Sequence, residues 1–408
     1  MSSEGRASTT AAPPGPLQGL RVLELGQMWA GPFVGALLGD FGARVIKVEK
    51  PGTPDAIRSW QPQKQGQPLL WKSMSRNKLT ITLDLSNPAA KPTVLKLIEN
   101  SDIVIENFRP GTLERWGYAP ATLSEKFPRI IWVRVSGYGQ DGPNAMHGGY
   151  ATAAEAFSGL ASITGYQDRG PLLSSFPMGD YLAGTFGAFG ALVAVNERHR
   201  SGRGQVVDVS LYEPILRILE ATIVRADQLG TEKQRLGNQF EESAPRNVYQ
   251  TKDGGYIAFS SGSDRLWLAT LDTIDRPEVK QDSRFFTVAG RVAHRAEVDG
   301  MVADWMRSKT TDEALEALHR NGLVADKINT IFDVFKDEHV RHRKSLIQVE
   351  DPDLGVMTLP APVPHLERTP GAVRWTGGGM GRDNDLVFRE ILNLSDGEIH
   401  QLSESRAI

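Results

Sequence analysis

The sequence predicts an α/β protein, with an open parallel sheet of Rossmann type in a large domain and a smaller α+β domain after it. Three observations carry this prediction. Short apolar runs alternate with helical stretches through the first half of the chain, as in a parallel sheet with helices on both faces. The polar stretch 230–246 interrupts that alternation. The 408 residues also exceed what one simple core needs, so two domains are expected.

The large domain is expected to contain six strands, each a short run rich in apolar residues. The first is LRVLELG at 20–26, which leads through Gly-Pro into a helical stretch at 32–41. The other five strands are expected at 44–49, 79–85, 102–108, 130–135 and 205–210. Further helices are expected at 93–99, 181–200 and 212–229.

The helical stretch 181–200 contains Gly184, Gly187 and Gly190 at three-residue spacing. Small residues at this spacing lie near one another on the helix surface. We therefore expect this helix to approach another backbone closely.

The expected domain limits are 1–16 for a disordered leader, 17–229 for the large domain, 230–335 for the small domain and 336–408 for a tail that returns to the large domain. In the small domain, Asp253-Gly254-Gly255 predicts the turn of a β-hairpin. Helices should follow at 264–274, 295–307 and 312–321, and a final helix near 383–393. The chain order is therefore large–small–large.

Composition excludes several classes of protein. A net charge of −3 leaves no basic footprint for nucleic acid or an anionic membrane. The chain has no cysteine, which excludes disulfides and thiolate chemistry. The leader lacks the apolar core of a signal peptide, and the apolar run 181–195 is too short and too rich in glycine to span a bilayer. We expect a cytoplasmic protein.

Common cofactor and metal motifs are missing. The first strand is followed by Gly26 to Pro32 (GQMWAGP) instead of G-x-G-x-x-G, and no Walker lysine pattern occurs. Of eight histidines only His339 and His342 lie close together, without a matching carboxylate cluster, so no metal site is expected. A Ser-His-Asp triad stays open, although no G-x-S-x-G elbow occurs.

Asp180 is the single charged residue in the stretch 172–195, at the start of a long apolar run. Aspartate is a favoured helix N-cap, because its side chain accepts a hydrogen bond from a free N–H of the first turn. A carboxylate at a helix start can also be a partly buried reactive group. The two interpretations are compatible, and the local sequence alone favours the cap.

Eight motifs follow one another in an order that resembles the class III coenzyme A transferases, the CaiB/BaiF-like family of formyl-CoA transferase and carnitine CoA-transferase. The resemblance covers about residues 17–408 and is densest up to 215. The motifs are LQGLRVLE at 17–24, AGPF at 30–33, FGARVIKVEKPG at 41–52, RNK at 76–78, DIVIENFRPG at 102–111, SGYGQDGP at 136–143, MGD at 178–180 and SGRGQ at 201–205.

The resemblance implies that Asp180 is the catalytic nucleophile. Its carboxylate would attack the thioester of an acyl-CoA, giving an aspartyl mixed anhydride and then an aspartyl-CoA thioester. Coenzyme A or acyl-CoA would be a substrate, and no tightly bound cofactor is expected. The pattern LGQ-x-x-AGPF is similar to that of members with succinyl-CoA as donor, while the acceptor acid stays open.

The resemblance also places coenzyme A contacts throughout the large domain. Trp29 and Ala30 would face the CoA, Lys50 its adenosine end, and Tyr150 the pantetheine or acyl end. The adenine would be lined by Leu83, Asp84, Leu85 and Ser86, with Asn107, Phe108, Arg109 and Arg115 nearby. Two positions depart from the family pattern, because Ser86 and Gly148 stand where formyl-CoA transferases carry lysines. The glycine loop of that family corresponds loosely to 260–263 (SSGS).

Two other functions are weighed against the transferase. An α-methylacyl-CoA racemase of the same family needs an acid and a base on opposite faces of a carbon. The position of that branch's histidine is Tyr150 here, and His147 comes three residues early. The alternative from another class is a non-catalytic acyl-CoA-binding α/β protein.

The resemblance finally implies an assembly. It predicts a homodimer in which each chain forms a ring threaded by the other, and it leaves open a heteromer with a paralogous subunit. The partners expected are acyl-CoA and carboxylic acids, with neither nucleic acid nor membrane.

Overall fold

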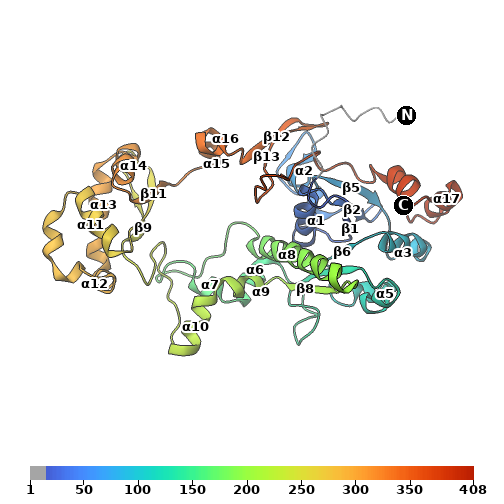
Figure 1. The fold of residues 1–408 in the computed structure, drawn as a ribbon, viewed down its shortest axis with the longest axis horizontal. Coiled ribbons are helices and arrows are strands. Elements are labelled where there is room, and N and C mark those ends of the chain that lie inside the picture. Colours follow the sequence, from blue (N-terminus) through green and yellow to red (C-terminus); the bar gives the residue numbers. More distant parts are fainter. Residues whose placement is uncertain (1–14) are drawn as a thin grey trace. The chain divides into compact units, whose positions relative to one another are not determined.

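The computed structural model describes residues 15–408, so residues 1–14 of the expected leader lie outside the described residues. Contacts within the chain group it into two compact units (Figure 1). Unit 1 holds the described residues up to Ser158, then Ser174–Ile218 and Arg341–Ile408. Unit 2 holds Gly159–Leu173 and Leu219–Val340. That each unit folds as an independent domain stays a prediction.

Unit 1 is built on a parallel sheet of six strands, which confirms the predicted α/β class. The strands lie in the order β5-β2-β1-β6-β7-β8, so the chain builds the sheet outward from β1 in one direction and then in the other. This is the strand order of the Rossmann fold. The strands are β1 Arg21–Glu24, β2 Arg44–Glu49, β5 Lys78–Thr82, β6 Ile103–Glu106, β7 Ile131–Ser136 and β8 Val206–Ser210.

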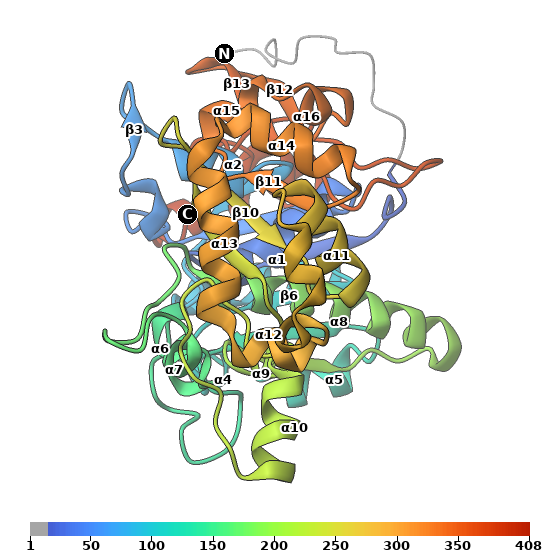
Figure 2. The same ribbon diagram turned by 90° about the vertical axis from the view of Figure 1, so that its left-hand side faces the viewer.

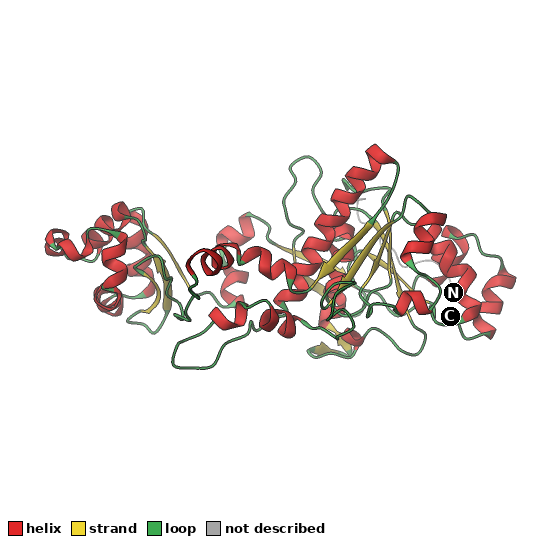
Figure 3. Cartoon of the chain, turned by 90° about the horizontal axis from the view of Figure 1, so that it is seen from below, coloured by secondary structure: helices red, strands yellow, loops and turns green. Residues whose placement is uncertain are grey.

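The register of the sheet follows from its apolar residues. Val22 of β1 lies opposite Val45 of β2 on one side and Ile103 of β6 on the other. All three side chains are buried, since helices cover both faces of a parallel sheet. Figure 3 shows the strands of this sheet in yellow with red helices on either side.

The helices of unit 1 before the tail lie in the connections between strands, except for the last of them, which follows β8. They are α1 Ala30–Asp40, α2 Leu69–Met74, α3 Lys91–Glu99, α4 Thr112–Arg115, α5 Pro120–Lys126, α6 Ala151–Phe157, α8 Met178–Ser201 and α9 Glu213–Ile218. Two short strands, β3 Gln63–Lys64 and β4 Gln67–Pro68, pair before α2.

Helix α8 approaches the rest of unit 1 through the glycine line that the sequence predicted. A Cβ on Gly184 would lie 2.9 Å from the carbonyl oxygen of Ala30 on α1. A Cβ on Gly187 would lie 2.9 Å from Val34, and one on Gly190 would lie 2.7 Å from Val207. Side chains at these positions would push α8 away from α1 and β8.

The sequence predicts that this apolar run is too short to span a bilayer, and that prediction from length is wrong. The helix has 24 residues, and by length and composition it is long enough to cross a bilayer. Its glycine face instead packs against α1, β7 and β8, as the face of a core helix does.

The tail returns to unit 1 and covers the edge of the sheet. Residues beyond a hairpin of β12 Leu346–Asp351 and β13 Gly355–Pro360 run beside β5, where the N–H of Thr80 donates to Asp383. An exposed edge strand invites association, and this contact covers it. The final helix is α17 Asp396–Glu404, whereas the stretch predicted near 383–393 forms a single π-helical segment, Leu386–Ile391.

Unit 2 contains an antiparallel sheet in the order β11-β10-β9, with β9 Arg246–Gln250, β10 Tyr256–Ser260 and β11 Val324–Lys327. Strands β9 and β10 form the hairpin expected at Asp253. Helices α11, α13 and α14 lie beside this sheet (Figure 2). The helices of the unit are α7 Leu160–Ile163, α10 Glu220–Leu229, α11 Asp264–Thr273, α12 Val288–Ala293, α13 Arg295–Ser308, α14 Thr311–Arg320 and α15 Ile331–Lys336, and α16 Glu338–His342 spans its end.

One predicted helix, 212–229, is divided in the structure. It forms α9 and α10, and the boundary between the two units falls beside Leu219, where the helix breaks. The apolar periodicity of the two pieces is continuous, so the sequence pattern did not reveal the break.

Candidate active site

The predicted coenzyme A contacts follow the carboxyl ends of five neighbouring strands of unit 1. Parallel strands end at one edge of their sheet, so these loops share that edge. The strand order reverses between β1 and β6, and ligands of Rossmann-type sheets bind in the crevice at such a reversal. Trp29 and Ala30 follow β1, and Lys50 follows β2. Leu83, Asp84, Leu85 and Ser86 follow β5. Asn107, Phe108, Arg109 and Arg115 follow β6, and Tyr150 follows β7.

Asn107 joins the two loops that flank this reversal. Its Oδ1 accepts a hydrogen bond from the N–H of Gln27 at 2.8 Å, and its Nδ2 donates to the carbonyl of Gln27 at 2.8 Å. The approach needs Gly26, because a Cβ there would lie 2.9 Å from Asn107 Oδ1. Asn107 therefore uses its amide to brace the loop after β1.

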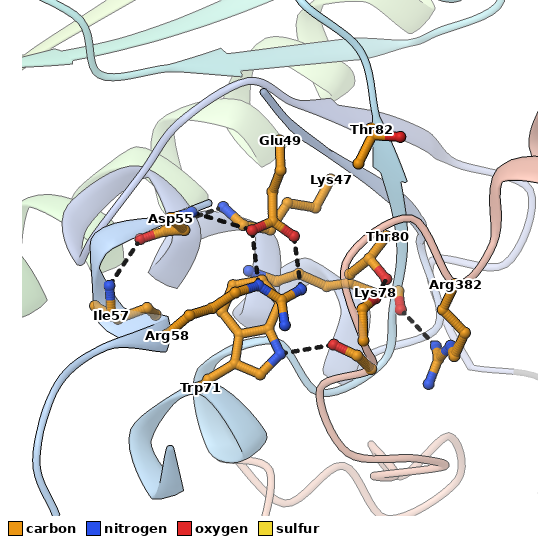
Figure 4. Close-up of polar contacts among 12 residues, drawn as sticks. Lys47, Glu49, Asp55, Ile57, Arg58, Trp71, Lys78, Thr80, Thr82 and Arg382 are labelled. Carbon is orange, nitrogen blue, oxygen red and sulfur yellow. Dashed lines mark hydrogen bonds and ion pairs between the residues drawn. The ribbon is translucent and has the colours of Figure 1, made fainter. Parts of the chain in front are cut away.

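The buried ammonium of Lys47 on β2 also contacts the loop after β1. Its Nζ donates to the carbonyl of Gly26 at 2.8 Å and lies 3.1 Å from Glu24 Oε1 and 2.9 Å from Asp55 Oδ2. Figure 4 shows Lys47 beside Asp55 and Glu49. Burial alone would lower the pKa of Lys47, but the carboxylates of Asp55, Glu24 and Glu49 outweigh it and raise that pKa. These carboxylates therefore favour the charged form of Lys47.

Asp55, the partner of Lys47, also contacts the backbone of the loop after β1. Its carboxylate accepts the N–H of Met28 at 3.1 Å and the N–H of Ile57 at 3.2 Å. Met28 has a left-handed φ of 65°, which is unfavourable for a residue with a side chain. The pair Lys47–Asp55 therefore holds a strained loop directly before Trp29.

A second lysine completes the charge cluster. Lys78 on β5 lies 2.8 Å from Glu24 Oε2 and donates to the carbonyl of Pro32 at 2.7 Å. Burial lowers the pKa of Lys78 to about 8, although Glu24 opposes the shift. Glu24 thus lies between two buried lysines, which tie β1 to β2 and β5.

Four aromatic rings contact one another, starting with Trp29 directly after this loop. Trp29 contacts Trp60 at 5.8 Å between ring centroids and Tyr181 at 5.3 Å, and Phe33 contacts Tyr181 at 4.7 Å. Trp60 follows the short 3₁₀ turn Ala56–Arg58 that Asp55 caps. The rings form an apolar wall that includes Tyr181, the residue directly after Asp180.

Asp180 does not cap the helix, so the interpretation that the local sequence favoured is wrong. Helix α8 begins at Met178, its N-cap position is Pro177, and Asp180 lies within the first turn. A proline was not expected there because it offers no side-chain acceptor. The carboxylate accepts a hydrogen bond from the backbone N–H of Ala151 on α6 instead.

The surroundings of Asp180 change its acidity. Burial raises the pKa of its carboxyl to about 6, and the hydrogen bond from Ala151 opposes the shift only in part. The negative charge of Asp180 in turn adds to the burial that raises the pKa of Tyr181. A partly buried carboxylate is the kind of group that can act as a nucleophile.

The residues predicted to line adenine differ in how far they are accessible. The side chains of Leu83 and Leu85 are buried, so only their backbone faces the edge. Lys50 pairs with Asp84 at 3.0 Å, and Ser86 donates to Asp84 at 2.6 Å. The Lys50–Asp84 pair joins the loops after β2 and β5. Ala30 is likewise buried within α1.

The residues after β6 and β7 are more open. Arg109 lies beside Gly148, where a Cβ would come within 3.0 Å of its guanidinium. Arg115 donates to the hydroxyl of Thr112 at 2.9 Å, and Phe108 contacts Trp116 at 5.2 Å between ring centroids. Tyr150 is exposed and lies directly before Ala151, the residue that hydrogen-bonds to Asp180.

The loop 260–263 belongs to unit 2. Arg291 is fully buried there and donates to the carbonyl of Gly262 at 3.1 Å, which fixes this loop within its unit. Within residues 15–408, no group of three or more His, Asp or Glu side chains is placed to hold a metal ion.

Sequence reasoning missed the charge cluster of Glu24, Lys47, Asp55 and Lys78. A signal was available, because Lys47 and Glu49 are charged residues among the buried positions of the strand RVIKVE. Charged residues in a central parallel strand are buried, and a buried charge needs a partner. The pattern does not say which partner, since Asp55 and Glu24 come from other elements.

Comparison with known proteins agrees with this architecture. The chain is 41% identical over 397 residues to the succinyl-CoA–D-citramalate CoA-transferase of Chloroflexus aurantiacus, with 97% of this chain and 99% of that protein covered. It is 38% identical to the beta subunit of the succinyl-CoA–L-malate CoA-transferase of the same organism, with 96% and 98% covered. A CaiB/BaiF family protein from Brucella suis has a similar crystal structure, with a TM-score of 0.82, 28% identity and coverage of 93% and 100%.

The model of CoA-transferase family III matches residues 17–384, which is most of the chain. The predicted resemblance and the predicted transferase activity are thereby confirmed. The chain belongs to CoA-transferase family III.

Proposed function

We propose that this enzyme transfers coenzyme A from succinyl-CoA to a second carboxylic acid, with Asp180 as nucleophile. The donor is supported by the two Chloroflexus relatives, whose names give succinyl-CoA as a substrate. The observation that carries the nucleophile is the placement of Asp180, a partly buried carboxylate of raised pKa directly before Tyr181 of the aromatic wall. A non-catalytic binding protein would have no use for it.

The first half of the reaction loads coenzyme A onto the enzyme. An oxygen of Asp180 attacks the thioester carbonyl carbon, the C–S bond breaks, and coenzyme A leaves as a thiolate. The products are this thiolate and a mixed anhydride between Asp180 and the succinyl group. The thiolate then attacks the carboxyl carbon of Asp180, releases succinate and forms an aspartyl-CoA thioester.

The second half reverses these steps with the acceptor. Its carboxylate attacks the same carbon of Asp180, and the coenzyme A thiolate leaves again. The thiolate then attacks the acceptor's carbonyl in the new anhydride, which restores Asp180 and gives the product thioester. No step needs a proton to be removed from Asp180, so no neighbouring base is required. Water must be kept away, because it would hydrolyse the anhydride.

The coenzyme A contacts remain those that the sequence predicted. Trp29 would contribute its ring, Ala30, Leu83 and Leu85 their backbone, and Tyr150 its exposed side chain near the acyl end. Asn107 and Phe108 would act by shaping the loops after β1 and β6. The charged and polar contacts would come from Lys50, Asp84, Ser86, Arg109 and Arg115, of which the two arginines suit phosphate groups. Bound cofactors other than the substrate are not part of the proposal, and we propose a cytoplasmic enzyme.

The racemase alternative gains no support from the site. Tyr150 stands at the position where the racemase branch carries its histidine, and a tyrosine is a weak base at neutral pH. His147 lies against the ring of Tyr138 at 6.1 Å between centroids.

We propose that the enzyme works as an interlocked homodimer with the chain order large–small–large. Apolar side chains exposed on one face of α8, namely Phe189, Leu192 and Val193, support an interface with a second copy. Phe332 and Ile331 on α15 are exposed as well. A paired assembly with a related subunit is the alternative, because one relative is named as the beta subunit of its enzyme.

Activity should depend on the ionisation of Asp180. Only the carboxylate attacks, and its raised pKa of about 6 means that kcat/KM should rise with pH through that value and level off above it. At pH 5 we expect kcat/KM about ten-fold below its plateau. The measurement is a pH–rate profile with succinyl-CoA. A profile flat down to pH 4 would contradict the shifted pKa.

Replacing Asp180 should abolish transfer without loss of the fold. We expect Asp180→Ala and Asp180→Asn to lower kcat by at least about a thousand-fold, because no intermediate can form. With wild type, succinyl-CoA and hydroxylamine or borohydride should modify Asp180 alone, as read by mass spectrometry. Asp180→Asn should melt at or above the wild-type temperature at pH 8, since burial of the ionised carboxyl costs stability above its folded pKa. Normal turnover by either variant would refute the assignment.

Arg109 and Arg115 should affect binding more than chemistry. Phosphate groups lie far from the reacting carbonyl and interact alike in the ground and transition states. We expect Arg109→Ala and Arg115→Ala each to raise KM for succinyl-CoA by about ten-fold with kcat within about two-fold. KM for the acceptor acid is the internal control. An unchanged KM for succinyl-CoA in both variants would show that the phosphates lie elsewhere.

The dimer should persist on dilution. Interlocked rings can separate only when one of them unfolds, so sedimentation should show a dimer down to nanomolar concentrations. Denaturant unfolding followed by fluorescence should coincide with loss of the dimer. A folded, active monomer at any concentration would contradict the interlocked arrangement.

A further inference from the structure

The chain leaves unit 1 after Ser158 and re-enters it at Ser174, directly before the helix that carries Asp180. The carboxylate of Glu155 joins the two ends of this excursion, residues 159–173. Glu155 Oε2 accepts the backbone N–H of Ser174 at 2.9 Å, and its Oε1 accepts the hydroxyl of Ser174 at 2.7 Å. The exit and the re-entry of the chain are therefore held together within unit 1.

The setting of Glu155 is unusual for a charged residue. It is only 2% exposed, and among residues 15–408 no lysine, arginine or histidine forms an ion pair with it. Burial of a carboxylate without a cation is costly, and only neutral donors offset the cost here. Both of those donors belong to Ser174, so the carboxylate of Glu155 is hydrogen-bonded to that one residue.

The same helix reaches the nucleophile. Glu155 and Ala151 lie four residues apart on α6, so their positions share one face of the helix. Ala151 donates its N–H to Asp180, while Glu155 holds Ser174. The helices touch closely at Gly179, where a Cβ would lie 3.3 Å from Ala154.

The segment between Ser174 and α8 is short and internally bonded. Met178 donates its N–H to the carbonyl of Phe176 at 2.7 Å, and Tyr181 donates to the carbonyl of Pro177 at 3.1 Å. The hydroxyl of Ser174 also lies 2.8 Å from the carbonyl of Phe176. A displacement of Ser174 would therefore be passed along this lead-in to the first turn of α8.

We propose that Glu155 is a positioning residue for the nucleophile. By holding Ser174, it sets the start of α8 so that the carboxylate of Asp180 lies at the N–H of Ala151, whatever the course of residues 159–173. This inference rests on the proposed role of Asp180. A shift of about 1 Å in a reacting group can cost two orders of magnitude in rate, so such a clamp would be visible in kcat.

The test compares Glu155→Ala, Glu155→Gln and Ser174→Ala with wild type, using succinyl-CoA and a dicarboxylic acceptor. Glu155→Ala loses both hydrogen bonds, so we expect kcat to fall about a hundred-fold with KM for succinyl-CoA within about three-fold. Ser174→Ala keeps the bond from its backbone N–H, and we expect a fall of about ten-fold. The rate at which succinyl-CoA and hydroxylamine modify Asp180 should fall in parallel.

Glu155→Gln is the rescue variant. The amide oxygen can accept the N–H of Ser174, and the amide nitrogen can donate to its hydroxyl, which then donates to Phe176. Both bonds are kept, so kcat should stay within about three-fold of wild type. Ser162→Ala is the matched control, because it removes a serine hydroxyl bonded at 2.7 Å to Gly159 within the same excursion but leaves Glu155 untouched. It should have wild-type kcat.

Several results would overturn the inference. One is wild-type kcat in Glu155→Ala or Ser174→Ala, and another is an equal loss in Glu155→Gln and Glu155→Ala. If Glu155→Ala does not fold by circular dichroism, Ser174→Ala alone decides. Failure of the proposed function is recognised separately, because Asp180→Asn would then turn over normally.

Discussion

The loops after β1 and β2 depend on one buried cation, the ammonium of Lys47. It joins β1 through Glu24, the following loop through Gly26 and the loop after β2 through Asp55. Removing one partner of a buried ion pair leaves the other charge uncompensated, at a cost of about 3–5 kcal/mol. Lys47, Glu24 and Asp55 therefore hold one another in a single arrangement. Asp55 in turn fixes Met28, and this sets the position of Trp29.

Close packing of α8 gives Asp180 its chemical character. The glycines of α8 bring it within van der Waals contact of α1 and β8, and Gly179 in its first turn lies close to Ala151 and Ala154 of α6. Its partial burial raises the pKa of Asp180. Because the pKa of Asp180 is raised on folding, its ionised form lowers the stability of the fold above that pKa.

Local patterns predicted the regular elements of the sheet well and its surroundings less well. All six expected strands occur, because parallel strands buried on both faces read as continuous apolar runs. The tail was predicted poorly. Its hairpin β12–β13 was missed, and so was α17, although Ser395 and Glu398 form a capping box whose S-x-x-E spacing is visible in the sequence. The periodicity across Leu219 concealed the division of one helix.

The sequence by itself determined the class of the fold, the family and Asp180 as the candidate nucleophile, because these follow from strand patterns and from motifs in a fixed order. Tertiary structure alone decided that Asp180 is not a helix cap, that Lys47 and Asp55 support the loop before Trp29, and that Glu155 holds Ser174. Each of these facts joins residues from different elements. A periodic pattern reports only neighbours within a turn or a strand, so contacts that arise when separate elements pack together cannot be read from it.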